Sequence, residues 1–151
     1  MTNVRAGLLS GLIAVLVTSA VNIVCRLLSL LPDAMDMKYM AELIIDPAQS
    51  PVPAFWFGLV LHIIGGTLIG LIFVLLIKQP TPLKGIGFSL LTVWLSMMLL
   101  VFPLRGRGFF GMNIGIVMPI STFLLNVIYG LIVGAVAQRQ VSLLPETGRN
   151  S

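Results

Sequence analysis

Few side chains in this sequence can do chemistry, and the single histidine, His62, is the first to consider. It lies in a long apolar run that continues to Ile77. Gly58, Gly66 and Gly70 recur around it at four-residue spacing. Residues at this spacing share one face of a helix, and small residues there let two membrane helices pack closely. We therefore predict that these glycines form a packing face with one polar group, His62, at its middle.

Catalysis requires a nucleophile or an acid–base pair, and the sequence offers His62 no such partner. Apart from Glu146 the acids stand together in one connecting segment, at Asp33, Asp36, Glu42 and Asp46. A single cysteine excludes an intrachain disulfide and every multi-cysteine metal site. GxxxxGK, HExxH and Cys-x-x-Cys motifs do not occur. We expect no catalytic residue, no metal site and no cofactor.

Methionine leaves one alternative open, because soft thioether ligands suit Cu(I). The methionines beyond Met1 all fall toward the same expected side of the membrane, at positions 35, 37, 40, 97, 98, 112 and 118. Methionine also fills irregular gaps in apolar packing, which is its commoner use. Copper handling is therefore a minor alternative.

The composition is that of an integral membrane protein. The 151 residues are 58% hydrophobic and 9% charged, with a mean hydropathy of +1.07. The net charge of +4 is too small and too scattered for a nucleic-acid surface. Apolar runs long enough to cross a bilayer predict an all-α, four-helix membrane bundle. We predict one transmembrane domain with spans at about 6–28, 54–77, 85–102 and 114–137.

The segments outside the spans carry further signals. Thr18-Ser19-Ala20 resembles a signal-peptide cleavage site, but the apolar run continues past it, so we expect a mature first helix. Apolar residues at helical spacing predict a short amphipathic helix on the membrane surface over 33–45. The polar tail from about 140 to 151 is expected to be disordered.

A glycine-rich loop, R-G-R-G-F-F-G, follows the third predicted span and carries Arg105 and Arg107. Two arginines at a membrane surface can contact an anionic lipid headgroup or an anionic solute. Simple anchoring at the interface is the alternative.

Two segments resemble each other and indicate an internal repeat. The stretch from His62 to Gly70 aligns without gaps on the stretch from Asn126 to Gly134. The first and third predicted spans also match in their small-residue faces, with Gly7 matching Gly85. A parallel repeat of two helices implies a pseudo-twofold axis along the membrane normal. His62 and Asn126 are then expected to face each other near mid-membrane, and Gly130 and Gly134 to form a second seam.

Several longer motifs resemble those of a bacterial family of small four-helix membrane proteins of unknown function. They are W-F-G-L-V-L-H-I-I-G-G-T-L-I-G, W-L-S-M-M-L-L-V-F-P-L, G-F-F-G-M and N-V-I-Y-G-L-I-V-G, and the resemblance covers Val4 to Ala137. Members of that family often carry histidine where this chain has Asn126. The resemblance implies the fold and a bacterial inner membrane, and it implies no reaction.

The interpretation that these features favour is a non-enzymatic inner-membrane protein, structural or accessory to a membrane complex. The alternative is a transporter or channel for a small solute or ion, assembled as a homo-oligomer. Its partners are then the lipid bilayer and a second copy or another membrane subunit, with no nucleic acid.

Lysine and arginine near the span ends set the expected orientation. Positions 5, 78, 84, 139 and 149 fall on one side of the membrane, and positions 26, 38, 105 and 107 fall on the other. This small excess favours both termini in the cytoplasm.

Introduced cysteines test this topology. In a Cys25→Ser background, single cysteines in 78–84 and in 105–112 are expected to react with an impermeant thiol reagent from opposite sides of the membrane. The second region should be labelled from outside intact cells. Labelling of both regions from the same side would contradict a four-span chain.

Overall fold

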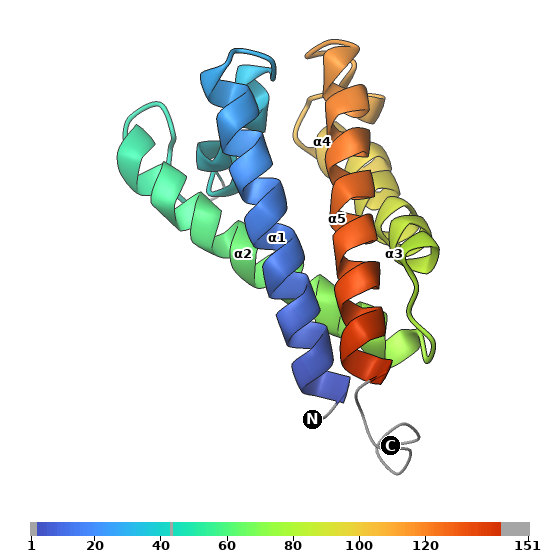
Figure 1. Cartoon of the computed structure of the whole chain (residues 1–151). Coiled ribbons are helices and arrows are strands. Elements are labelled where there is room, and N and C mark those ends of the chain that lie inside the picture. Colours follow the sequence, from blue (N-terminus) through green and yellow to red (C-terminus); the bar gives the residue numbers. More distant parts are fainter. Residues whose placement is uncertain (1–2, 43, 143–151) are drawn as a thin grey trace.

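The computed structural model describes residues 3–42 and 44–142, and this part of the chain is helical without strands. Four helices are long and apolar enough to cross a membrane (Figure 1). They are α1 (Asn3–Leu27), α2 (Pro51–Leu76), a third span (Pro82–Leu104) and α5 (Val117–Ser142). The third span begins with α3 (Pro82–Phe88) and ends with α4 (Phe102–Leu104). The predicted all-α membrane bundle is thus confirmed.

Two spans begin earlier than the sequence predicts because each starts on a proline. Pro51 opens α2 and Pro82 opens α3. Proline suits the first turn of a helix, where its missing N–H has no partner to lose. The Thr81 side chain also accepts a hydrogen bond from the Lys84 amide at 3.3 Å and caps α3. At the other end of the chain α5 runs on to Ser142, and the rest of the predicted disordered tail, 143–151, lies outside the described residues.

The segment after α1 differs from the predicted helix over 33–45. It forms two short 3-10 turns, Asp33–Met35 and Met37–Met40, separated by Asp36 in an extended conformation. The Asp36 side chain accepts a hydrogen bond from the Lys38 amide, which offers the backbone an alternative to a continuous helix. Arg26 pairs with both Asp33 and Asp36 and holds these turns against the end of α1.

The first two spans pack along glycine. Gly11 of α1 lies against α2 so closely that a Cβ atom built on it would be 2.6 Å from the Thr67 carbonyl oxygen and 3.0 Å from the Gly70 Cα. Gly66 accepts the Val15 side chain of α1. The backbones can approach this closely only where a side chain is missing.

The third span and α5 form a second pair with the same kind of contact. A Cβ built on Gly85 would meet the Gly130 carbonyl oxygen and lie 3.0 Å from the Gly134 Cα. Gly85 thus sits between two glycines of α5, as Gly11 does on α2. The residue that corresponds to Gly85 in these contacts is Gly11 rather than Gly7, one helical turn from the expected match.

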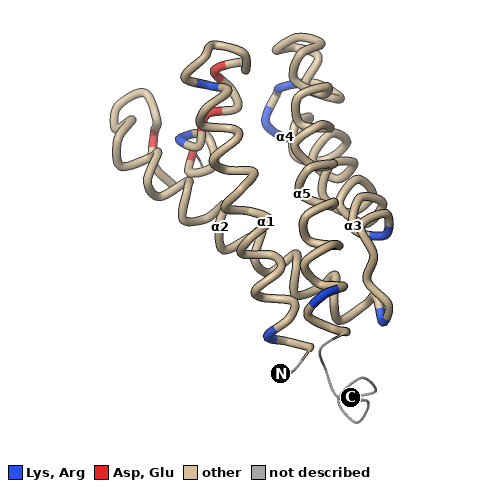
Figure 2. Tube along the Cα trace, viewed as in Figure 1, with Lys and Arg blue, Asp and Glu red and all other residues tan. Residues whose placement is uncertain are grey.

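The glycine contacts gather toward one end of the bundle, where α1 begins and α5 ends (Figure 1). We call this the terminal end, and the opposite end, with residues 28–50 and 105–116, the loop end. The described acidic residues all lie toward the loop end (Figure 2). A buried core joins both pairs: Ala6, Ala14, Val15, Phe73, Val74, Tyr129, Val133, Ala137 and Val141.

Paired alanine substitutions test the second seam. Gly85→Ala places a methyl group against the α5 backbone and should cost about 1–3 kcal/mol, the usual penalty of overpacking. Gly87→Ala is the matched control because nothing lies within 4 Å of its Cβ position. The control should gain up to about 1 kcal/mol from better helix propensity. Reversible unfolding in mixed detergent measures both, and equal effects would show that Gly85 is not a contact.

Candidate functional site

A crevice of about 690 Å³ lies between the helices and extends along α2 from Leu61 to Leu76, alongside the glycines of that helix. Residues of all four spans line it, together with the turns after α1 and the loop after α4. Its volume is in the range of about 300–1,000 Å³ that small-molecule sites occupy. Because hydrocarbon surrounds the spans, the crevice is mainly apolar with a limited set of polar groups.

Each span contributes polar side chains to the crevice. They are Thr18 and Asn22 from α1, His62 from α2, Thr92 and Ser96 from the third span, and Thr122 and Asn126 from α5. The three threonines donate to carbonyl oxygens of their own helices, at 2.6–3.0 Å. These hydroxyls are therefore satisfied without a ligand.

Asn22 and His62 differ from the threonines because they make no hydrogen bond to their own helix. The Asn22 side chain is 7% exposed, and in the described residues neither it nor His62 has a hydrogen-bond partner. The buried side-chain atoms without a partner in the described residues are Ser19 Oγ and Arg26 Nε, so the polar atoms of Asn22 and His62 face the open space of the crevice. Both groups are therefore free to hydrogen-bond to a molecule within it.

Asn126 lies in the same crevice but does not bridge to His62 as the repeat predicts. Its amide donates to the Thr122 carbonyl oxygen at 2.9 Å, and its oxygen accepts from the buried Ser89 hydroxyl at 3.1 Å. Asn126 therefore ties α5 to the third span. His62 and Asn126 have different roles despite their matched positions.

Two contacts beside the crevice join the two helix pairs. The Tyr129 hydroxyl of α5 donates to the Gly66 carbonyl oxygen of α2 at 2.6 Å. The rings of Phe73 on α2 and Phe88 on α3 lie 5.3 Å apart. These contacts join α2 to α5 and to α3 beside the crevice, which continues along α2 to Leu76.

One wall of the crevice has widened helical turns. The third span is π-helical over Ser89–Trp94 and Met97–Val101. Pro103 contributes to this, because it has no N–H and its ring crowds the carbonyl of the preceding turn. Segments of this kind occur often at functional sites in helices. Here they present Thr92 and Ser96 to the crevice.

Arg105 and Arg107 lie at the mouth, and the structure gives both the same partner. The Arg105 Nη1 atom is 2.9 Å from one oxygen of Glu42, and the Arg107 Nη2 atom is 2.7 Å from the other. Arg105 also donates to the Tyr39 carbonyl oxygen. The loop between them depends on glycine, since Gly108 has a φ of 72°. Sequence reasoning found both arginines but missed Glu42, which stands 65 positions away from Arg107.

A second charged group stands beside the mouth. Arg26 pairs with Asp33 at 2.7 Å and with Asp36 at 3.3 Å, and Lys38 lies 3.6 Å from Asp33. Desolvation alone would raise the pKa of Asp33, but attraction to Lys38 and hydrogen bonds from Arg26 and Tyr39 hold the pKa below its usual value. Asp33 therefore stabilises the fold above its unfolded pKa, and this contribution is lost as the pH falls through the lowered value.

The predicted glycine face of α2 divides between two neighbours. Gly66 and Gly70 lie against α1, whereas Gly58 lies against the backbone of Met37 in the turn after α1. Because Gly58 has no side chain, that turn packs directly against α2 at the mouth of the crevice. The four-residue spacing is compatible with either contact.

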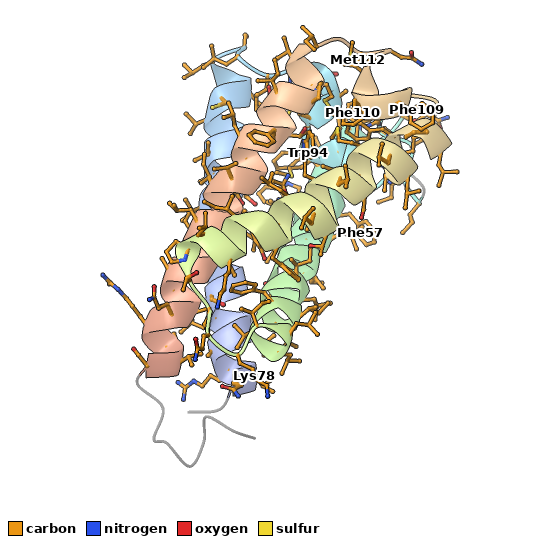
Figure 3. All side chains as sticks on the ribbon, turned by 90° about the vertical axis from the view of Figure 1, so that its right-hand side faces the viewer. Phe57, Lys78, Trp94, Phe109, Phe110 and Met112 are labelled. Carbon is orange, nitrogen blue, oxygen red and sulfur yellow. The ribbon has the colours of Figure 1, made fainter. Side chains whose placement is uncertain are left out.

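Several methionines gather near the mouth as packing residues. Met98 and Met118 form a buried cluster with Phe102, and Met35 and Met97 pack against it. Trp94 and Phe110 lie next to this cluster with ring centroids 5.7 Å apart (Figure 3). Within the described ranges, no three His, Cys, Asp or Glu side chains come together as a metal site.

The fold and the crevice define a multi-pass α-helical membrane protein with an internal site open toward one end. The chain belongs to a family described as "Family of unknown function (DUF6789)", whose model matches residues 1–143. No curated protein and no solved structure matches it.

A pair of leucine substitutions tests the different roles of Asn126 and His62. Asn126→Leu leaves the fully buried Ser89 hydroxyl without its partner and should lower the free energy of unfolding by about 1–3 kcal/mol. His62→Leu removes no protein hydrogen bond and should leave stability unchanged. Unfolding in mixed detergent compares the two variants. Equal losses would mean that His62 bridges helices after all.

Proposed function

We propose that this chain is a non-enzymatic protein of the bacterial inner membrane that binds a lipid-soluble molecule in its crevice, in a role accessory to a membrane complex. The ligand is an apolar molecule with at least one hydrogen-bonding group. It enters from the bilayer or from the loop end. The described part of the crevice supports binding rather than reaction, since His62 has no acid or nucleophile beside it.

The observation that supports this proposal best is Asn22. Asn22 is 7% exposed, it lines a crevice large enough for a small molecule, and its side chain has no hydrogen-bond partner among the described residues. His62, on another wall, is in the same position. Two such groups around one space favour a ligand that supplies their hydrogen bonds.

Transport of a small solute or ion by a homo-oligomer is the second candidate. The polar groups on every span favour it, because polar side chains in a bundle can line a path. The close contacts at Tyr129 and at the glycine seams oppose it within one copy, because they leave little room between the spans that they join. Purification in mild detergent separates the readings: a stoichiometric partner supports the accessory role, and a homo-oligomer alone supports transport.

We also propose an orientation of the chain in the membrane and an internal repeat of two helices. Arg5 lies in the first turn of α1, Arg139 lies in the last turn of α5, and Lys78 lies at the same end (Figure 3), which supports a cytoplasmic location for that end. The crevice then opens toward the outside. The corresponding glycine contacts of the two helix pairs support a two-helix repeat, with Gly11 and Gly85 as equivalent positions.

The ligand is tested by filling the crevice. Protein purified from bacterial membranes in mild detergent should retain a small molecule detectable by native mass spectrometry. Ser96→Phe places a ring in the crevice and should remove most of it. Leu91→Phe is the matched control, because Leu91 is on the same span, is 69% exposed and does not line the crevice. Equal retention by wild type and both variants would refute the site.

A further inference from the structure

The two arginines at the mouth of the crevice share one carboxylate. Each oxygen of Glu42 forms an ion pair with one arginine, so Arg105, Arg107 and Glu42 together keep one surplus positive charge. The neighbouring group of Arg26, Lys38, Asp33 and Asp36 is balanced. Of these two charged groups, only the one with Arg105 and Arg107 has an unneutralised positive charge.

Both guanidinium groups keep donors to spare. Arg105 uses Nη1 and Arg107 uses Nη2, and their remaining nitrogens have no partner within the described residues. A guanidinium group carries five N–H donors in a planar fork that matches the oxygens of a phosphate. The two side chains are 21% and 15% exposed, so they are partly shielded from water. A phosphate there would be held more strongly than at an open surface.

The position of this positive charge beside the apolar crevice determines which class of ligand can bind. Arg105 and Arg107 line the same crevice as Met97, Val101 and Met118, which are apolar. A ligand that uses both parts needs an anionic group at one end and a hydrocarbon chain at the other. A phosphodiester carries one negative charge, equal to the surplus.

We propose that the mouth binds the phosphate of an anionic membrane lipid of the phosphatidylglycerol type, with an acyl chain in the crevice. This rests on the proposed function and names the class of its ligand. Glu42 acts as an internal competitor: it keeps the arginines in place and limits their charge to what one phosphodiester neutralises. The hydrogen-bonding groups at Asn22 and His62 lie deeper, where the ester region or a water molecule beside the chain can reach them.

Lipid retention in defined bilayers tests the proposal. The purified full chain is placed in nanodiscs of phosphatidylcholine and phosphatidylglycerol in equal amounts, released into the gas phase, and its retained lipids are identified. Wild type should prefer phosphatidylglycerol. Arg105→Gln with Arg107→Gln should reduce that preference about tenfold, as expected for the loss of charged hydrogen bonds. Lys84→Gln with Arg139→Gln removes equal charge at the terminal end and should change nothing.

Variants of Glu42 separate charge from structural damage. Glu42→Gln raises the surplus charge and should increase the preference for phosphatidylglycerol. Glu42→Gln with Arg107→Gln removes both ion pairs yet keeps the original surplus of one positive charge on Arg105, so the preference should persist. Loss of preference in this double variant while its circular dichroism is native, or no preference in wild type, would overturn the proposal.

Ser96→Phe distinguishes the two levels of inference. If it lowers the retention of both lipids and wild type shows no preference for the anionic lipid, the crevice binds a ligand but the headgroup assignment is wrong. If it alters retention of neither lipid, the proposed function itself fails.

Discussion

The close approach of helix backbones at glycine is the contact on which the rest of this structure depends. In a bilayer the lipid is as apolar as the helix surface, so helices associate through shape and close packing rather than by escape from water. Gly11 between Gly66 and Gly70, and Gly85 between Gly130 and Gly134, bring each pair together in the terminal half. Phe73 and Tyr129 belong to the buried core of that half, and Met98, Phe102 and Met118 form a second buried cluster near the loop end. Residues of both clusters line the crevice.

The polar groups of the spans make sense within this arrangement. Threonines can satisfy themselves on their own helix, and Asn126 with Ser89 forms a bond between two spans. Asn22 and His62 do neither. Within the described residues they face the crevice, and in a medium without water a hydrogen bond to either group there is favourable.

At the loop end, the turns after α1 and the loop after α4 line one side of the crevice. Gly58 lets the turn at Met37 lie directly on α2, and Arg26 holds the same turn through Asp33 and Asp36. Glu42 then receives both arginines of the distant glycine-rich loop. Ion pairs at the membrane surface therefore hold the turns after α1 and the loop after α4 in place. Because these side chains are partly exposed, each ion pair is modest in strength, and another anion can compete for the arginines.

The sequence by itself determined the class, the spans and the small-residue faces, because hydrocarbon thickness and helical periodicity leave clear marks on composition. It could not set the register of the glycine contacts: a four-residue repeat looks the same after a shift of one turn, and only packing selected Gly11 as the partner of Gly70. It predicted a helix over 33–45, where the Asp36 side chain and Arg26 hold two 3-10 turns instead. It singled out Arg105 and Arg107 but missed Glu42, and it matched His62 with Asn126 although their surroundings differ. These features depend on contacts between residues far apart in the chain, and such contacts arise only when the helices tilt and pack in three dimensions.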